Sequence, residues 1–270
     1  MDFKKILVRS LSGIIYIGVI VGAILLEYRG ITLLSMLFAA LASIEFSKIT
    51  VGLRRDNIAT VIVDTAAACL LSLAFFGFPL ALWLVCMIVR LVMELYTDRA
   101  DHLRQLAFSF MTQIYIGVPL ALMTGFAEFL GAPRLLLAIF CFIWINDTGA
   151  FLVGCTLGKH KLFPSISPKK TWEGFIGGLL LCMAAGVAFG MLWADYFGFR
   201  LGFVAWTGLA AVVSVFATWG DLIESMIKRN LSIKDSGNMI PGHGGILDRI
   251  DSLLLVMPAS FIYVLLIMAL

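Results

Sequence analysis

The chain alternates between long apolar runs and short polar connections. A membrane-spanning helix needs roughly 20 mostly apolar residues, and nine runs approach that length. They cover residues 11–27, 30–49, 58–77, 79–97, 106–128, 134–157, 174–194, 201–223 and 251–270. The pattern therefore predicts an all-α, polytopic membrane protein with about nine transmembrane helices.

The composition agrees with this prediction. Hydrophobic residues make up 61% of the 270 residues, charged residues 14%, and the mean hydropathy is +1.01. A soluble domain has roughly 45–50% apolar and about 25% charged residues, so the expected solvent is the lipid bilayer. A net charge of +3 is too small to indicate a nucleic-acid partner. The five cysteines lie within apolar runs and predict neither disulfides nor a zinc site.

Basic residues are distributed unevenly between alternate connections. With the N-terminus placed in the cytoplasm, sixteen of the twenty Lys and Arg residues fall in cytoplasmic connections. Arg29, Arg134 and Arg200 fall on the opposite side, and Arg90 lies within a span. Because cytoplasmic loops carry an excess of positive charge, we expect a cytoplasmic N-terminus and a C-terminus outside.

Polar motifs divide the chain into two parts. Residues 1–133 contain about five predicted helices and few motifs. Residues 134–270 contain about four predicted helices and two long, polar cytoplasmic connections, 158–174 and 221–251. We therefore expect the second part to be the catalytic region.

Several ionisable residues fall within the predicted spans, where unpaired charge is costly. Arg90 and Glu94 are four residues apart and are expected to pair on one helix face. Asp64 is left open between a structural partner near a helix end and a functional group, and Glu45, within one turn of a helix end, needs no special role. Asp147 lies mid-span beside polar neighbours, which predicts a cavity open to the cytoplasm or a bound cation.

The last cytoplasmic connection interleaves acidic, basic and glycine residues. Asp221, Ser225 and Lys228 share a helix face by their spacing, as do Asp248 and Asp251. A glycine-rich turn between them lets backbone N–H groups approach an anion. Carboxylates suit Mg²⁺, whereas lysine and arginine offset phosphate charge. The connection therefore predicts metal-assisted phosphoryl chemistry on the cytoplasmic side.

A second segment, residues 167–174, adds two lysines and two hydroxyls at a predicted helix start, where anions bind favourably. His243 lies in the glycine-rich turn and is left open between a base, a phosphate donor and a turn-stabilising group. We favour a structural or phosphate-contact role. No Walker-type phosphate loop is present in the sequence.

These residues resemble the signature of the phosphatidate cytidylyltransferase family, also called CDP-diacylglycerol synthases. The matching positions are Ser225, Lys228, Arg229, Lys234, Asp235, Gly237, Ile240, Pro241, His243, Gly244, Gly245, Asp248, Arg249 and Asp251. Residues 146–150 and 167–174 are similar to the family's upstream motifs, so the resemblance covers residues 134–252. It implies the Mg²⁺-dependent reaction of CTP with phosphatidate to give CDP-diacylglycerol and pyrophosphate.

Roles follow from this resemblance as hypotheses. The predicted catalytic residues are Asp221, Asp248, Lys170, Lys228 and Arg229. The predicted substrate contacts are Ser167, Lys169, Thr171, Ser225, Lys234, Asp235, His243, Gly244, Gly245 and Arg249. The predicted ligands of Mg²⁺ are Asp147, Asp221, Asp248 and Asp251, and four carboxylates leave scope for a second cation.

Two alternatives remain open. One is a CTP-dependent kinase of a polyprenol-type alcohol, which transfers the γ-phosphate of CTP. The other is an ion-coupled transporter with a broken helix at Asp147 and Gly149. The expected location is the cytoplasmic (inner) membrane, with the site facing the cytoplasm, and a homodimer is compatible with the sequence.

Overall fold

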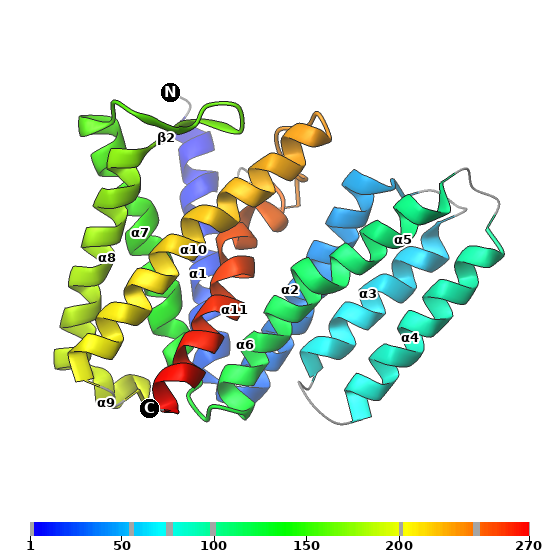
Figure 1. Cartoon of the computed structure of the whole chain (residues 1–270), viewed down its shortest axis with the longest axis horizontal. Helices are drawn as coiled ribbons and strands as arrows, with labels where there is room; N and C mark the ends of the chain where they lie inside the picture. Colours follow the sequence, from blue (N-terminus) through cyan, green and yellow to red (C-terminus); the bar gives the residue numbers. More distant parts are fainter. Residues whose placement is uncertain are drawn as a thin grey trace. The chain divides into compact units, whose positions relative to one another are not determined.

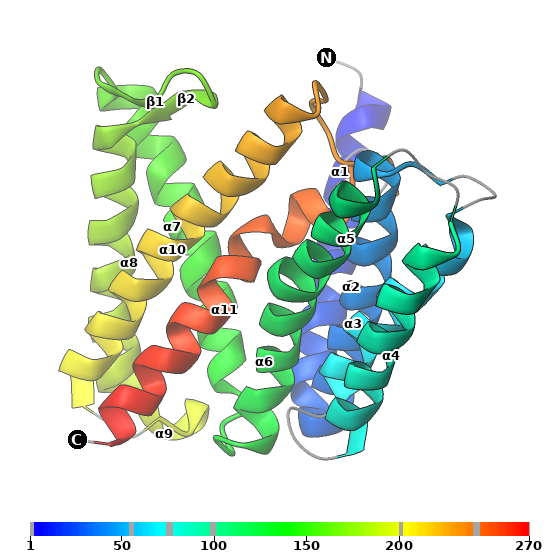
Figure 2. The ribbon, with the colours of Figure 1, turned by 45° about the vertical axis from the view of Figure 1, so that its right-hand side comes forward.

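The computed structural model describes residues 3–53, 57–73, 78–97, 101–199, 202–239 and 244–269. Almost all of the regular structure in these ranges is helical (Figures 1 and 2). The helices are α1 (Phe3–Leu25), α2 (Glu27–Thr50), α3 (Ile58–Leu73), α4 (Phe78–Leu95), α5 (His102–Met111), the π-helix η1 (Thr112–Gly117), α6 (Val118–Glu128), α7 (Leu135–Leu157), α8 (Trp172–Leu192), α9 (Ala194–Phe197), α10 (Gly202–Asn230) and α11 (Leu247–Met268). A short hairpin consists of β1 (Lys161–Phe163) and β2 (Ser167–Thr171).

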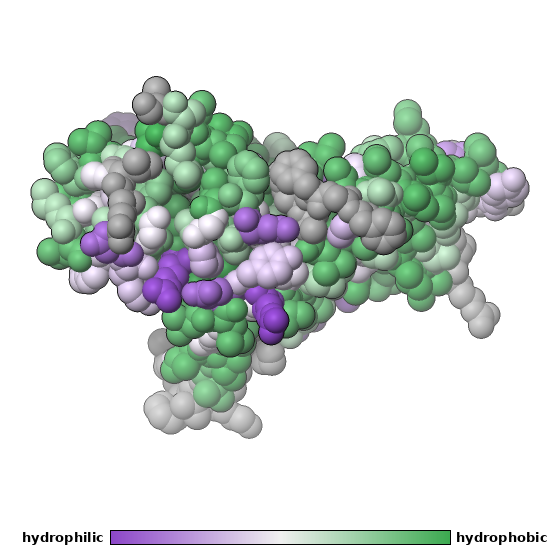
Figure 3. Space-filling model, turned by 90° about the horizontal axis from the view of Figure 1, so that it is seen from below, coloured by the Kyte–Doolittle hydropathy of each residue, from purple (hydrophilic) through white to green (hydrophobic). Residues whose placement is uncertain are grey.

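Length and hydropathy confirm the prediction of an all-α, polytopic membrane protein. Within the described ranges, six helical segments are long and apolar enough to cross a membrane. They are Glu27–Thr50, His102–Glu128, Leu135–Leu157, Trp172–Leu192, Gly202–Asn230 and Leu247–Met268, with shorter apolar helices at Ser10–Leu25 and Ile58–Leu73. On the face seen in Figure 3, apolar residues cover most of the surface and surround a smaller hydrophilic patch. The total of nine spans stays a prediction.

The chain forms two compact units. Unit 1 comprises Met1–Phe129 and Ile233–Arg249, and unit 2 comprises Leu130–Ser232 and Ile250–Leu270. Unit 1 therefore contains most of the glycine-rich connection as well as the N-terminal helices. Phe46 and Phe126 are completely buried in the core of unit 1.

Arg90 and two acidic side chains that contact it are buried inside unit 1. The Arg90 guanidinium contacts the Glu94 carboxylate at 2.7 Å and the Asp64 carboxylate at 3.5 Å. Ser109 Oγ donates a hydrogen bond to Asp64 Oδ1 over 2.5 Å. We call Asp64, Arg90 and Glu94 the unit 1 ion cluster. The predicted Arg90–Glu94 pair is confirmed, and Asp64 proves to be a structural partner of Arg90.

Helices α7, α8 and α10 lie side by side in unit 2 (Figure 1). Glycines on α8 allow a very close approach to α7. A Cβ atom on Gly174 would lie 2.8 Å from the Ala150 carbonyl oxygen, and one on Gly178 would lie 2.9 Å from the Asn146 carbonyl oxygen. Small residues commonly let membrane helices approach in this way. The contact holds α7 and α8 at a fixed separation and so positions Asp147.

The β1–β2 hairpin joins α7 to α8 and spans their ends in Figure 2. Its strands pair antiparallel, with Lys161 opposite Thr171. Glu173 accepts backbone hydrogen bonds from Lys159 at 3.1 Å and His160 at 3.2 Å. Thr171 Oγ1 accepts the Gly174 N–H at 3.1 Å and so caps α8, satisfying an N–H group that the helix itself cannot. These bonds fix β2, which carries two of the predicted lysines.

Candidate active site

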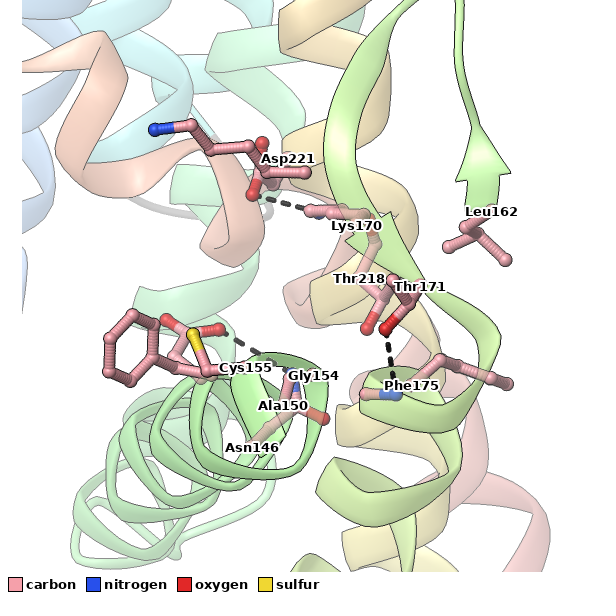
Figure 4. Close-up of a pocket in the computed structure, with 14 residues that line it drawn as sticks. Asn146, Ala150, Gly154, Cys155, Leu162, Lys170, Thr171, Phe175, Thr218 and Asp221 are labelled. Atoms are coloured by element: carbon pink, nitrogen blue, oxygen red, sulfur yellow. Dashed lines mark hydrogen bonds and ion pairs between the residues drawn. The ribbon is translucent and has the colours of Figure 1, made fainter. Parts of the chain in front are cut away.

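A cavity of about 350 Å³ opens within unit 2. Its walls come from α7, β2, the first turn of α8 and the middle of α10 (Figure 4). The polar lining includes Asp147, Lys169, Lys170, Thr171 and Asp221. Two separate sequence motifs and the mid-helix aspartate thus meet around one chamber.

Lys170 and Asp221 form the polar centre of this cavity. Lys170 Nζ lies 2.8 Å from Asp221 Oδ2, and it also donates to the Thr218 carbonyl oxygen at 3.2 Å (Figure 4). Ser225 Oγ, one helical turn further along α10, donates to Asp221 Oδ1 at 3.1 Å. The ammonium group is therefore held at the cavity wall by one carboxylate and one carbonyl.

Asp147 faces the cavity from the middle of α7. Its carboxylate is exposed there and accepts a long contact of 3.5 Å from Asn146 Nδ2. Asn146 is itself buried, and its Oδ1 accepts a 2.6 Å hydrogen bond from Ser214 Oγ on α10. The amide therefore ties α7 to α10 directly beside the aspartate and orients its neighbour.

Asp147, Asp221 and Asp251 lie close enough together to interact electrostatically. We call these three carboxylates the unit 2 acidic cluster. Lys170 acts on Asp147, and Lys228 acts on Asp251. Lys228 also forms a 2.5 Å ion pair with the buried Glu224.

This donor set fits a divalent cation. Asp147, Asp221 and Asp251 bring three carboxylates together, with Lys170 and Lys228 among the cations near them. Hard carboxylate oxygens are the usual ligands of Mg²⁺. Among the described residues, no group of three His, Cys, Asp or Glu side chains is arranged to hold a metal ion. The fit to a divalent cation therefore rests on the chemistry of the carboxylates alone.

The remaining predicted residues of unit 2 lie at or near this chamber. Lys169 is exposed and lines the cavity, and Ser167 begins β2. Arg229 is exposed, and its Nε donates to the Ile166 carbonyl oxygen at 3.4 Å. The arginine therefore joins the end of α10 to the hairpin.

The glycine-rich connection belongs to unit 1. Asp248, in the first turn of α11, accepts the backbone N–H of Ser236 at 3.1 Å and that of Gly245 at 2.9 Å. Gly244 has φ +84°, a conformation that side chains other than glycine rarely adopt. The predicted metal role of Asp248 stays a prediction, and these bonds add a structural role.

Three other predicted contacts in the connection are exposed, namely Lys234, Asp235 and Arg249. The Arg249 carbonyl oxygen accepts a 3.0 Å hydrogen bond from the hydroxyl of Tyr16. His243 lies outside the described residues.

The sequence did not predict the roles of Asn146 with Ser214, of Glu224 or of Glu45. Asn146 and Ser214 form an inter-helix bond across 68 positions, which no local pattern signals. Glu224 was recoverable, because its spacing of four from Lys228 is that of a helical ion pair. Glu45 was expected to have no special role, yet it is 3% exposed and accepts hydrogen bonds from the glycine-rich connection.

Comparison with known proteins decides the family. A sequence model described as "Cytidylyltransferase family" matches residues 7–267. The chain belongs to the cytidylyltransferase family. The match extends through both units and includes the cavity residues.

Individual curated relatives match the chain over a shorter stretch than the family model does. A phosphatidate cytidylyltransferase of Staphylococcus aureus (strain COL) is 42% identical over 156 residues, which is 56% of each chain. That of Staphylococcus haemolyticus (strain JCSC1435) is 41% identical over 152 residues, again 56% of each chain. The chain thus spans about half the length of the curated relatives it matches.

Proposed function

We propose that the chain transfers the cytidylyl group of CTP to phosphatidate, forming CDP-diacylglycerol and releasing pyrophosphate. Family membership supports a cytidylyltransferase, and the names of the relatives support phosphatidate as the acceptor. The observation that carries the proposal is one cavity in which Lys170 lies against Asp221 and which Asp147 also lines. That combination of charges suits phosphate groups bound with a cation.

The proposed reaction begins with a phosphatidate phosphate oxygen attacking the α-phosphorus of CTP. The bond from this phosphorus to the bridging oxygen of pyrophosphate breaks, and pyrophosphate leaves. The attacking oxygen is already anionic at neutral pH, so no strong general base is needed. The main obstacle is repulsion between two polyanions, and positioning together with charge neutralisation supplies most of the catalysis.

The lysines of β2 are suited to this task. Lys170 is anchored by Asp221 and the Thr218 carbonyl, so its ammonium group is preorganised at the cavity wall. Preorganised charge costs little reorganisation when the transition state forms. Lys169 lines the same cavity from an exposed position and can contact the outer phosphates.

Asp147, Asp221 and Asp251 would hold Mg²⁺ in unit 2. For Asp248, which belongs to unit 1, the same role is predicted by the signature motif alone. When bound, Mg²⁺ supplies positive charge that offsets the repulsion between the two substrates. The same carboxylates leave scope for a second cation. Asn146, bonded to Ser214, keeps the backbone beside Asp147 in place for this role.

The proposed setting is the cytoplasmic leaflet of the inner membrane. The excess of Lys and Arg in alternate connections supports this orientation. Phe151 and Phe175 also line the cavity, and Phe151 is 68% exposed. Apolar surface beside the charged centre suits a substrate whose phosphate is polar and whose tails are apolar.

Two labelled forms of CTP test this proposal. The purified protein is incubated with phosphatidate, Mg²⁺ and CTP labelled at the α- or the γ-phosphate. We expect α-label in the lipid product and γ-label in pyrophosphate. Label from the γ-phosphate in a polyprenol-type alcohol would instead establish a lipid kinase. Ion flux in proteoliposomes without CTP, together with no α-label in lipid, would favour a transporter.

A further inference from the structure

The carboxylate of Glu45 is enclosed by the glycine-rich connection. Glu45 lies near the C-terminal end of α2, and its side chain is buried within unit 1. Its oxygens accept the backbone N–H of Ile246 at 3.0 Å and that of Leu247 at 3.1 Å. Ser236 Oγ donates a third hydrogen bond to the same carboxylate. One buried acid thus binds three donors that lie about two hundred residues away in sequence.

These donors are the groups that a helix start leaves unsatisfied. Ile246 and Leu247 lie at the start of α11, where N–H groups have no partner within the helix. A carboxylate at this position also interacts favourably with the helix dipole. Hydrogen bonds to a charged acceptor are stronger than neutral ones. Glu45 therefore caps α11 from a different helix.

Two glycines of the signature lie so close to this carboxylate that a side chain would not fit. A Cβ atom on Gly237 would lie 2.8 Å from Glu45 Oε2, and one on Gly245 would collide with Glu45 Oε1. Ser236 is also bound from the other side, because its backbone N–H donates to Asp248 at 3.1 Å. Glu45 and Asp248 together hold the two ends of the connection.

We propose that Glu45 is a positioning residue that holds the described parts of the signature connection, 234–239 and 244–248, in their active conformation. The functional part of this inference rests on the proposed cytidylyl transfer, because the connection carries predicted phosphate contacts such as Lys234 and Gly244. It assigns to an N-terminal helix a direct role in shaping a motif of the C-terminal half. Glu45 acts through the connection and does not contact substrate.

The test compares Glu45→Gln with the wild-type protein by amide hydrogen exchange and by kinetics. The glutamine keeps the size of the side chain but loses its charge, and it presents an N–H₂ group to backbone donors. We expect exchange at 244–250 to become roughly 10- to 100-fold faster, as follows from weakened hydrogen bonds to a charged acceptor. We expect kcat/KM for CTP to fall about tenfold or more, and Glu45→Asp to recover part of it.

Glu94→Gln is the matched control, because Glu94 is also a buried acid of unit 1, with 3% exposure. It should accelerate exchange around the unit 1 ion cluster and leave the KM for CTP unchanged. Ser236→Ala removes one donor to Glu45 and keeps the backbone bond to Asp248. Its effect should be smaller than that of Glu45→Gln, and the double variant should be less than additive.

Unchanged exchange at 244–250 in Glu45→Gln would overturn the proposal. Faster exchange spread evenly over unit 1, as in a general loss of stability, would overturn it as well. If the wild-type protein transfers no cytidylyl group, the proposed function fails, while the exchange measurement still decides whether Glu45 holds the connection.

Discussion

Both units contain charged side chains among apolar helices, but they balance the charges differently. In the unit 1 ion cluster, Arg90 lies between Asp64 and Glu94, and all three are at most 6% exposed. In the unit 2 acidic cluster, Asp147 and Asp221 line a cavity together with Lys170, and Asp251 interacts electrostatically with both aspartates. The first arrangement is buried in the core of unit 1, whereas two carboxylates of the second face an open cavity.

This difference separates structural charge from functional charge. Removing one partner of a buried ion pair mainly destabilises the fold, because it leaves the other charge uncompensated. An acidic cluster beside a cavity is completed by a ligand from solution. The following predictions test this contrast, from the largest expected effect on turnover to the smallest.

Removal of divalent cations should have the largest effect. EDTA is expected to abolish formation of CDP-diacylglycerol, because the unit 2 acidic cluster would then repel the phosphates of both substrates. Added Mg²⁺ should restore the rate. Hydrogen exchange at 58–73, which reports on the unit 1 ion cluster, should not change with EDTA. Full activity in EDTA would refute the role given to the acidic cluster.

Asp221→Asn should lower kcat by about 10³-fold, the scale for loss of a preorganised electrostatic contact. The side chain is 39% exposed, so the variant should fold and remain monodisperse in detergent. A radiochemical assay of lipid product measures the rate, and the Mg²⁺ concentration for half-maximal activity should rise. A rate near that of the wild-type protein would contradict the assignment.

Lys170→Met should lower kcat by about 10²-fold, since it removes one cation from the cavity wall. Lys169→Met is the matched control, because Lys169 is exposed and solvent ions can replace its charge. Initial rates at saturating CTP and phosphatidate provide the comparison. Equal losses in both variants would mean that the anchoring of Lys170 by Asp221 has no catalytic consequence.

Arg90→Met should leave the turnover of folded protein within about twofold while lowering stability by about 3–5 kcal/mol, because two buried carboxylates lose their shared guanidinium and keep only Ser109 and His102 among the contacts described. Thermal unfolding in detergent measures the loss. Adding Glu94→Gln should recover part of it, since the second change removes one of the uncompensated charges. A large fall in kcat at full folding would show that the unit 1 ion cluster takes part in the reaction.

Hydropathy predicted the helices well because lipid demands continuous apolar surface and internal backbone bonding. The run 134–157 corresponds closely to α7, whereas 106–128 is in fact α5, η1 and α6, interrupted by a π-helix. A π-helix changes backbone bonding without changing hydropathy. The β1–β2 hairpin also escaped prediction, because its strands of three and five residues are too short to show a pattern.

The parts of the candidate site that could be predicted are charged residues within apolar runs and polar residues at helical spacing. Asp147 was predicted to be functional because an unpaired carboxylate within an apolar helix is costly, and it lines the cavity. Local spacing also identified Ser225 as a neighbour of Asp221. Glu45 gave no such signal, because its role depends on donors that tertiary folding brings to it.

The glycine contact between α7 and α8 limits how the cavity can change during evolution. Gly174 and Gly178 leave no space for a larger side chain without moving a backbone. Natural variants that accept bulkier or smaller lipids should therefore differ elsewhere on the wall, at Phe151, Cys155 or Leu162, where a side chain can be exchanged without displacing a helix.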